Sequence, residues 1–230
     1  MIWFANAFAW LADPAHYAGV NGIPVRLGQH VAYTGITLVI AAAVALPLGF
    51  LIGHTGKGRS LAVQVSGGLR SLPTLGLVIV LALLLGLGIG APMIALVILA
   101  VPPVLAGAYS GVESVDPRVV DAARAVGMTG WQVLWRVEVP LGLPLVIGGL
   151  RSAALQAIAT WTVAAVLPLG GLGRYIYDAI ATYDYTEMFA GSVLVIVLAL
   201  VVDGLFAVLQ RLVVPRGVVA AGGAPAAVPA

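Results

Sequence analysis

The chain has 230 residues, of which 61% are hydrophobic and only 9% charged, with a formal net charge of +2 and no cysteine. A water-soluble domain carries about 25% charged residues, so this composition excludes a cytosolic enzyme, while the high hydrophobicity excludes intrinsic disorder. This composition suits a lipid bilayer. The small net charge does not indicate a nucleic-acid partner. The absence of cysteine excludes disulfides and thiol chemistry.

The first 27 residues are predicted to form an extracytoplasmic or interfacial segment, 1–27. They lack a basic start, and their apolar stretch is broken by Asn6 and ended by Asp13-Pro14, so the pattern does not indicate a signal peptide. Aromatic residues such as Trp3 and Trp10 suit a position along the membrane surface. The sequence leaves open whether this segment is itself a membrane helix.

Five apolar stretches follow. A bilayer core about 30 Å thick needs roughly 20 residues per helix, and open strands would leave backbone groups unpaired in lipid. The sequence therefore predicts an all-α polytopic membrane protein with about five transmembrane helices inside a membrane domain at 28–215. The predicted spans are 31–53, 70–87, 91–111, 152–167 and 188–202, the last running past Asp203 to about residue 209.

The basic residues predict the orientation. If the segment between the third and fourth spans faces the cytoplasm, most lysines and arginines lie inside and only Arg26 and Arg174 lie outside. We therefore expect a cell-membrane protein with its N-terminus outside and its C-terminus in the cytoplasm. Under this topology Arg70, Arg151 and Asp203 fall near the cytoplasmic ends of their spans, where snorkelling is the favoured interpretation over a place in the translocation path.

A polar segment at 113–140 separates the third and fourth spans. Asp116 can cap a helix that has Pro117 at its first position and runs through residue 126. Gly127 suits the left-handed position that ends a helix. Thr129 and Gln132 then form a capping box that starts a second helix, predicted to stop near Pro140. The sequence thus predicts two short helices joined by a tight glycine turn.

This helix pair suits docking on a protein better than reading DNA. A recognition helix needs basic residues near the phosphates, and the second helix offers only Arg136 between Trp131 and Glu138. A small alanine-rich helix fits a groove on another protein, since alanines allow close backbone approach. The alternative is a loop that packs on its own helix bundle.

The same segment resembles the EAA loop of ABC importer permeases. That family has Glu-Ala-Ala, three residues, Gly, nine residues, then Ile, any residue, Leu and Pro. Here Asp121-Ala122-Ala123, Gly127 and Val137-Glu138-Val139-Pro140 keep every spacing, with Asp for Glu and Val for Ile and Leu. The resemblance implies that this loop is a coupling helix docking on an ATPase subunit, with roles for Asp121, Ala122, Ala123, Gly127, Val137 and Pro140.

Further segments are similar to permeases of glycine betaine, choline and carnitine importers, over about residues 29–215. They are Leu72-Pro73-Thr74, Gly148-Gly149-Leu150-Arg151-Ser152-Ala153 and Pro168-Leu169-Gly170-Gly171-Leu172-Gly173. Ala106-Gly107 and the altered glycine loop depart from that group. Methionine importers share much of the loop pattern, so a permease for methionine or another amino acid is the alternative.

The resemblance implies a MetI-like ABC permease fold with a cytoplasmic coupling helix pair, and a chain that is not itself an enzyme. It implies no cofactor in this chain, with ATP and Mg²⁺ bound by the partner ATPase. The other implied partners are a second permease chain, identical or different, and an extracytoplasmic solute-binding protein. A passive channel or scaffold with a protein-docking helix is the competing class.

The remaining candidates concern the outer side and the histidines. Gly170, Gly171 and Gly173 are predicted to form a tightly bent or flexible loop at the outer mouth of the path, because a phosphate loop would need a preceding strand and a following lysine. Ser152 and Ser192 have no histidine at their depth, which argues against an intramembrane protease. A C-terminal tail at 216–230 is predicted to be disordered.

The three histidines, His16, His30 and His54, are too dispersed to predict a metal site, and His54 is expected to be solvated in a basic loop. Five aromatic residues lie toward the predicted outer side, and the favoured interpretation is an aromatic belt at the interface rather than a cation–π surface for a quaternary ammonium solute. They are Trp161, Tyr175, Tyr177, Tyr183 and Tyr185.

Overall fold

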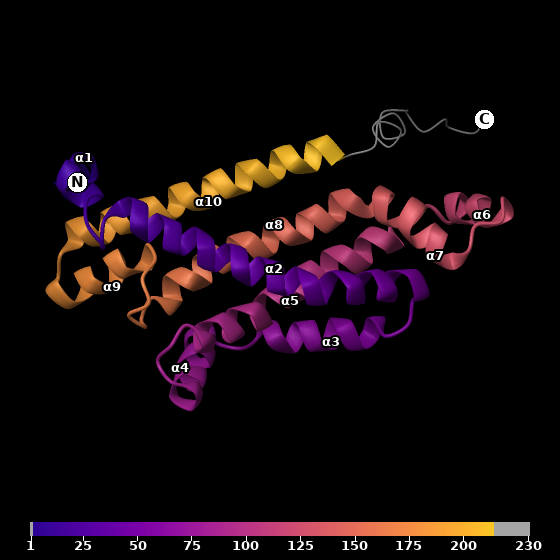
Figure 1. Ribbon diagram of the computed structural model, residues 1–230, viewed down its shortest axis with the longest axis horizontal. Coiled ribbons are helices and arrows are strands. Elements are labelled where there is room, and N and C mark those ends of the chain that lie inside the picture. Colours follow the sequence, from indigo (N-terminus) through magenta and orange to yellow (C-terminus); the bar gives the residue numbers. More distant parts are fainter. Residues whose placement is uncertain (1, 214–230) are drawn as a thin grey trace, which may run out of the picture.

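The computed structural model describes residues 2–213, and every regular element in that range is a helix. Four runs are long and apolar enough to cross a membrane, and they lie lengthwise beside one another in Figure 1. This confirms the predicted all-α fold with four to five membrane helices, while the predicted tail at 216–230 lies outside the described residues. The four runs are α2 (Ile23–Thr55), α5 (Gly90–Glu113), the run Gly130–Ala164, and α10 (Tyr185–Val213).

The predicted span at 70–87 differs from the structure in its extent. The structure has α3 (Arg59–Arg70) and α4 (Thr74–Leu85), which meet at an angle of 84° across a short break. Pro73 lies in that break, and a proline disfavours the helical conformation of the residue before it. The pair is therefore a broken span or a re-entrant loop, and α4 stands away from the long helices in Figure 1.

The fourth span begins earlier than predicted. The second short helix, α7 (Gly130–Val133), does not stop near Pro140 but continues through a π-helical turn, η2 (Leu134–Glu138), into α8 (Val139–Ala164). A proline inside a helix lacks an N–H and crowds the carbonyl four residues earlier, and the wider π turn directly before Pro140 accommodates both effects. The predicted start at residue 152 is thus inside α8, and the helix ends at Ala164.

Helix α5 forms the centre of the bundle, where it packs against α2 and α8. In its most apolar stretch 61% of the residues are buried, compared with 6% in α10. The contact with α8 is made by glycines: a Cβ built on Gly107 would lie 2.7 Å from the Cα of Gly149, and one on Gly142 would lie 2.5 Å from the backbone of Gly111. Small residues let helix backbones approach closely in a membrane, and the α5–α8 crossing depends on them.

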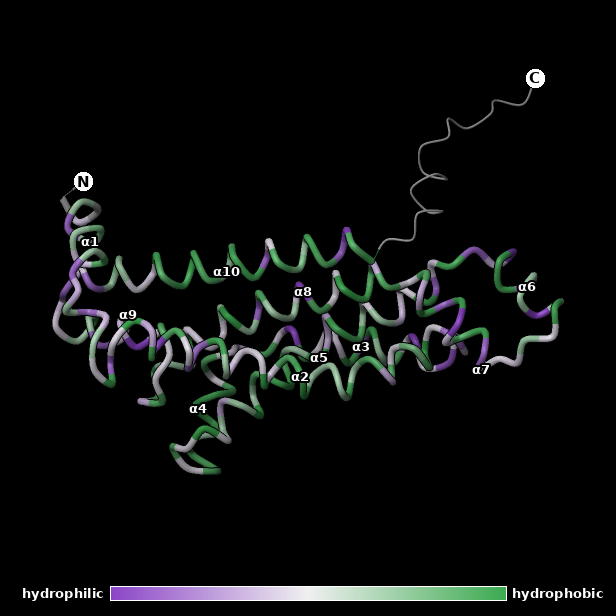
Figure 2. The backbone as a smooth tube through the Cα atoms, turned by 45° about the horizontal axis from the view of Figure 1, so that its top comes forward, coloured by the Kyte–Doolittle hydropathy of each residue, from purple (hydrophilic) through white to green (hydrophobic). Residues whose placement is uncertain are grey.

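Polar residues gather at the two ends of the long helices, and the apolar runs lie between them (Figure 2). At one end α6 (Pro117–Ala125) and α7 extend beyond the bundle. At the other end lie α9 (Gly173–Thr182), α1 (Ile2–Ala12) and the 3-10 turn η1 (Pro14–Tyr17). Helix α1 packs on α10, with the Trp3 and Tyr185 rings 5.3 Å apart.

Candidate functional site

The first candidate site is the helical elbow, defined as Pro117–Val133, which comprises α6, the glycine turn and α7. Asp116 caps α6 by accepting a 2.8 Å hydrogen bond from the Arg118 N–H. Gly127 has φ +87°, a conformation that strongly favours glycine, and so turns the chain after α6. The predicted capping box of Thr129 and Gln132 is present. The local signals in the sequence therefore produce the predicted helix pair.

Helix α6 projects from the end of the bundle, where it packs on α7 and η2. The predicted coupling residues Asp121, Ala122 and Gly127 are exposed, and Ala123 is buried against the elbow. Apolar side chains are exposed beside them, with Val126 at 77% and Trp131 at 64% of their full surface. An apolar tip with interspersed charges is the surface that a protein groove can cover.

The elbow is joined to the bundle through Glu138. This carboxylate is only 5% exposed, and it accepts a 2.5 Å hydrogen bond from Nδ1 of His54 in the last turn of α2. The prediction that His54 is solvated in a loop is wrong, because its α2 helix extends to Thr55 and brings the ring against Gly130 at the start of α7 and Glu138 at the end of η2. A Cβ on Gly130 would lie 3.4 Å from Nε2 of His54. Val137 and Pro140 flank the same carboxylate in sequence and are half-buried.

Aromatic rings reinforce this junction. The Trp135 ring lies edge-on to Phe50 of α2 at 5.7 Å and to Trp131 of the elbow at 5.5 Å. Such edge-to-face pairs contribute about 0.5–1.5 kcal/mol beyond their buried area. The elbow therefore continues directly into α8 and is attached laterally to α2, so it is connected to two of the long helices.

The second candidate site is the glycine loop, defined as Pro168–Gly173, between α8 and α9. Gly170 and Gly171 have φ of +97° and +79°, so the loop is tightly bent, one of the two predicted alternatives. The Gly171 N–H donates to Oε1 of Gln29 at 2.9 Å, and Gln29 sits where a Cβ on Gly170 would lie. Gly173 begins α9 and packs against the Thr162 backbone. The loop is thus fixed to the start of α2.

His30 completes the attachment of this loop. Its side chain is 1% exposed, with Nδ1 accepting from the Leu172 N–H at 3.3 Å. Because Nδ1 accepts, Nε2 carries the proton and donates to the Ile158 carbonyl at 3.1 Å. The neighbouring Tyr33 hydroxyl donates to the Leu169 carbonyl at 2.8 Å. One face of α2 therefore holds α8 and the glycine loop together, a role that the separated positions of the histidines did not reveal.

The predicted aromatic belt is wrong for two of its five members. Trp161 is 4% exposed and donates from Nε1 to Oγ1 of Thr37 at 2.9 Å. Tyr175 is 8% exposed, its hydroxyl donates to the Asn21 carbonyl at 2.7 Å, and burial raises the pKa of its phenol. Helix packing at this end buries both rings, whereas Tyr183 and Tyr185 are exposed as a belt requires.

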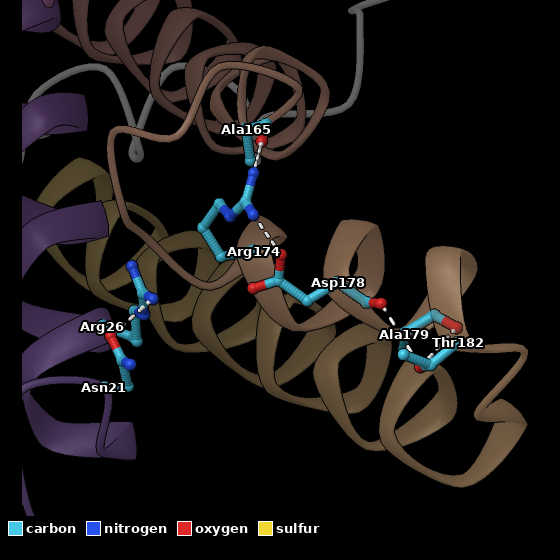
Figure 3. Close-up of polar contacts among 7 residues, drawn as sticks. All are labelled: Asn21, Arg26, Ala165, Arg174, Asp178, Ala179 and Thr182. Atoms are coloured by element: carbon cyan, nitrogen blue, oxygen red, sulfur yellow. Dashed lines mark hydrogen bonds and ion pairs between the residues drawn. The ribbon is translucent and has the colours of Figure 1, made fainter.

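Two arginines at the same end have partners within the chain (Figure 3). Arg174 donates to the Ala165 carbonyl at 3.1 Å and pairs with Asp178 one helical turn later. Arg26 donates to Oδ1 of Asn21 at 2.8 Å. These bonds tie α9 and the start of α2 to the loops beside them.

The interpretation of Arg151 and Asp203 as snorkelling residues is replaced by an ion pair. Nε and Nη2 of Arg151 donate to the two carboxylate oxygens of Asp203 at 2.6 and 2.7 Å, which joins α8 to α10. Such a two-bond arrangement is the strongest geometry for an arginine and a carboxylate. Sequence reasoning missed it because it treated each charge alone. Within residues 2–213 no three His, Cys, Asp or Glu residues are arranged to hold a metal ion.

The amino-acid sequence is similar to those of known transport proteins. Residues 45–216 match the family described as "Binding-protein-dependent transport system inner membrane component". The chain is 31% identical to the glycine betaine/carnitine/choline transport system permease protein OpuCB of Bacillus subtilis, over 84% of this chain and 88% of that protein. It is 34% identical to the osmoprotectant import permease protein OsmW of Salmonella typhimurium, over 83% of this chain and 91% of that protein.

The fold is also found among solved structures. The chain superposes on a protein of the inward-facing MetNI methionine ABC transporter with a TM-score of 0.74 and 20% identity, covering 82% of this chain and 94% of that one. At that identity the likeness concerns the fold alone, and it confirms the predicted MetI-like architecture. It does not extend to what the chain carries.

Proposed function

Because the chain belongs to the family of binding-protein-dependent transport system inner membrane components, we propose that its cargo is a small osmoprotectant such as glycine betaine, choline or carnitine. The chain is the permease subunit of an ABC importer, and ATP hydrolysis belongs to a separate ATPase subunit. The proposal of the cargo is supported by relatives at 30–34% identity over most of the chain, which are permeases for glycine betaine, carnitine and choline, for choline, and for osmoprotectants. For the methionine alternative, the likeness to the MetNI methionine transporter is at 20% identity and supports the fold alone.

The elbow is the proposed docking site for the ATPase, which would bind ATP and Mg²⁺. The observation that carries this proposal is the position of α6, which extends free of the bundle with Asp121 and Ala122 exposed. Had α6 been folded against the long helices, no surface would be left for a motor subunit. ATP binding can drive transport only if each nucleotide state favours a different packing of the membrane helices.

The path of that movement is proposed from the connections of the elbow. Its second helix is continuous with α8, and the His54–Glu138 bond links it to α2. Helices α2 and α8 are connected again at the glycine loop, where Gly170, Gly171 and Gly173 would form the outer gate. A second permease chain, identical or different, would complete the translocation path.

Co-expression with an ABC ATPase and a solute-binding protein tests this function. We expect the ATPase to co-purify with the chain, and proteoliposomes of the complex to accumulate radiolabelled choline or glycine betaine only when ATP and the binding protein are both present. A passive channel would instead equilibrate the solute without ATP. Deleting residues 117–125 should remove the ATPase from the purified chain.

Cysteine labelling tests the proposed orientation, in which the elbow is cytoplasmic. The natural chain has no cysteine, so a single Arg124→Cys substitution on the exposed surface of α6 gives one reactive thiol. A membrane-impermeant maleimide should label it only in inverted vesicles or after permeabilisation. Tyr183→Cys, at an exposed position at the opposite end, is the matched control and should be labelled from outside. The reverse pattern would overturn the topology.

A further inference from the structure

A polar cavity lies at the end of the molecule opposite the elbow. Its volume is about 270 Å³, close to the lower end of the range of about 300–1,000 Å³ that is typical of ligand pockets. It is formed where α1, η1, the start of α2, α9 and α10 meet. We call it the aromatic pocket, and its lining includes Trp10, His16, Asn21, Tyr175 and Glu187.

Two rings meet at a corner of this pocket. The Trp10 and Tyr175 rings are 5.4 Å apart at an interplanar angle of 79°. His16 stacks on Trp10 at 3.8 Å, and its Nδ1 donates to the Trp10 carbonyl, which fixes the indole in place. Tyr175 is fixed by its hydrogen bond to the Asn21 carbonyl. Rigid aromatic walls of this kind attract cations through the negative potential of their ring faces.

Glu187 supplies the charge of the pocket. Within residues 2–213 its carboxylate has no hydrogen bond and no ion pair, and the titratable groups around it are Asp178, Asp184 and His16. Neither arginine at this end forms an ion pair with Glu187: Arg174 pairs with Asp178, and Arg26 donates to Oδ1 of Asn21 at the rim of the pocket (Figure 3). A half-buried carboxylate beside aromatic rings thus lacks a permanent cationic partner.

We propose that the aromatic pocket binds a quaternary ammonium cation on its way into the permease. This rests on the proposed function, because that function supplies the cargo class. A trimethylammonium group cannot donate a hydrogen bond, so ring faces and a nearby negative charge are the groups that can recognise it. Since Glu187 is the only charged carboxylate lining the pocket, a plain cation such as choline should bind better than glycine betaine, whose own carboxylate it repels.

Equilibrium binding of radiolabelled choline to the purified full chain in nanodiscs tests this. We expect saturable binding that tetramethylammonium displaces and that glycine betaine displaces more weakly. Glu187→Gln should weaken choline binding about tenfold and reduce the preference over glycine betaine, because it removes the charge and keeps the shape. Trp10→Phe should weaken binding less than Trp10→Ala, since a smaller ring remains.

Matched controls lie outside the pocket. Glu113→Gln makes the same change of carboxylate to amide at the opposite end of the molecule, where Glu113 pairs with Arg59, and Trp3→Ala removes an exposed indole from the same helix as Trp10. Both should leave choline affinity unchanged. The proposal would be overturned if Glu187→Gln bound choline as tightly as the wild type, or if the control variants lost as much choline affinity as Glu187→Gln.

Transport by the complete complex separates this inference from the proposed function. If the wild-type complex takes up choline or glycine betaine with ATP but the chain shows no saturable choline binding, the proposed binding in the aromatic pocket is wrong and the proposed transport function is retained. If the complex takes up no quaternary ammonium compound, the proposed cargo itself fails. A Glu187→Gln complex that transports choline poorly but hydrolyses ATP normally would support both.

Discussion

Replacing Gly149 by alanine is expected to destabilise the folded permease and to abolish transport, although alanine is the better helix former. A Cβ at this position would lie 2.7 Å from the Pro103 carbonyl oxygen and 2.8 Å from the Cα of Gly107. Both are backbone atoms of α5, so no side-chain rotation can relieve the overlap and the two central helices must separate. Overpacking a core costs about 1–3 kcal/mol, and a backbone clash lies at the upper end of that range.

The neighbouring glycine provides the control. A Cβ on Gly148 would meet only Nε2 of Gln210, at an ordinary 3.8 Å. Gly148→Ala should therefore be neutral or should gain up to about 1 kcal/mol from helix propensity. The measurement is the thermal unfolding temperature of the purified chain in detergent, together with uptake by the assembled complex. Equal stability of the two adjacent variants would mean that the α5–α8 crossing is looser than the glycine contacts imply.

Replacing Gly127 by valine is expected to uncouple ATP hydrolysis from uptake while the membrane helices stay inserted. Gly127 has φ +87°, and forcing a β-branched residue into this region costs of order 1–3 kcal/mol. Since nothing lies within 4 Å of its Cβ position, the effect comes from backbone strain and not from a clash. The strain would reorient α6 relative to α7, so that the ATPase no longer moves α8 productively.

Gly127→Asn is the matched variant, because asparagine tolerates the left-handed conformation better than other residues. We expect it to retain most of the uptake, whereas Gly127→Val should lose about tenfold or more, which corresponds to ~1.4 kcal/mol. The measurement is the ratio of solute transported to ATP hydrolysed in proteoliposomes. Unaltered uptake by Gly127→Val would contradict the coupling role.

Local signals in the sequence were sufficient to predict the elbow. The cap at Asp116, the turn at Gly127 and the capping box at Thr129 act over a few residues, so their geometry does not depend on the rest of the fold. Pro140 was misinterpreted for the opposite reason. A proline does not always end a helix in a membrane bundle: Pro140 follows the π turn at 134–138, and Pro144 lies inside α8.

The connections between distant segments could not be predicted in this way. The bonds of His30 and His54 join positions more than 80 residues apart, and nothing near either histidine in the sequence indicates its partner. The glycine crossing did leave a signal. Gly107 and Gly111 of α5 are spaced as in small-residue contact motifs of membrane helices, and so are Gly49 and Gly53, which pack α2 against α5.

The Arg151–Asp203 pair has a consequence for biogenesis. A single charge of this kind raises the free energy of transferring a helix from the translocon into lipid. The bidentate bond neutralises both, so α8 and α10 enter the bilayer at lower cost as a pair than one after the other. Because α8 precedes α10 in the chain, Arg151 has no carboxylate partner from α10 until that helix has been synthesised.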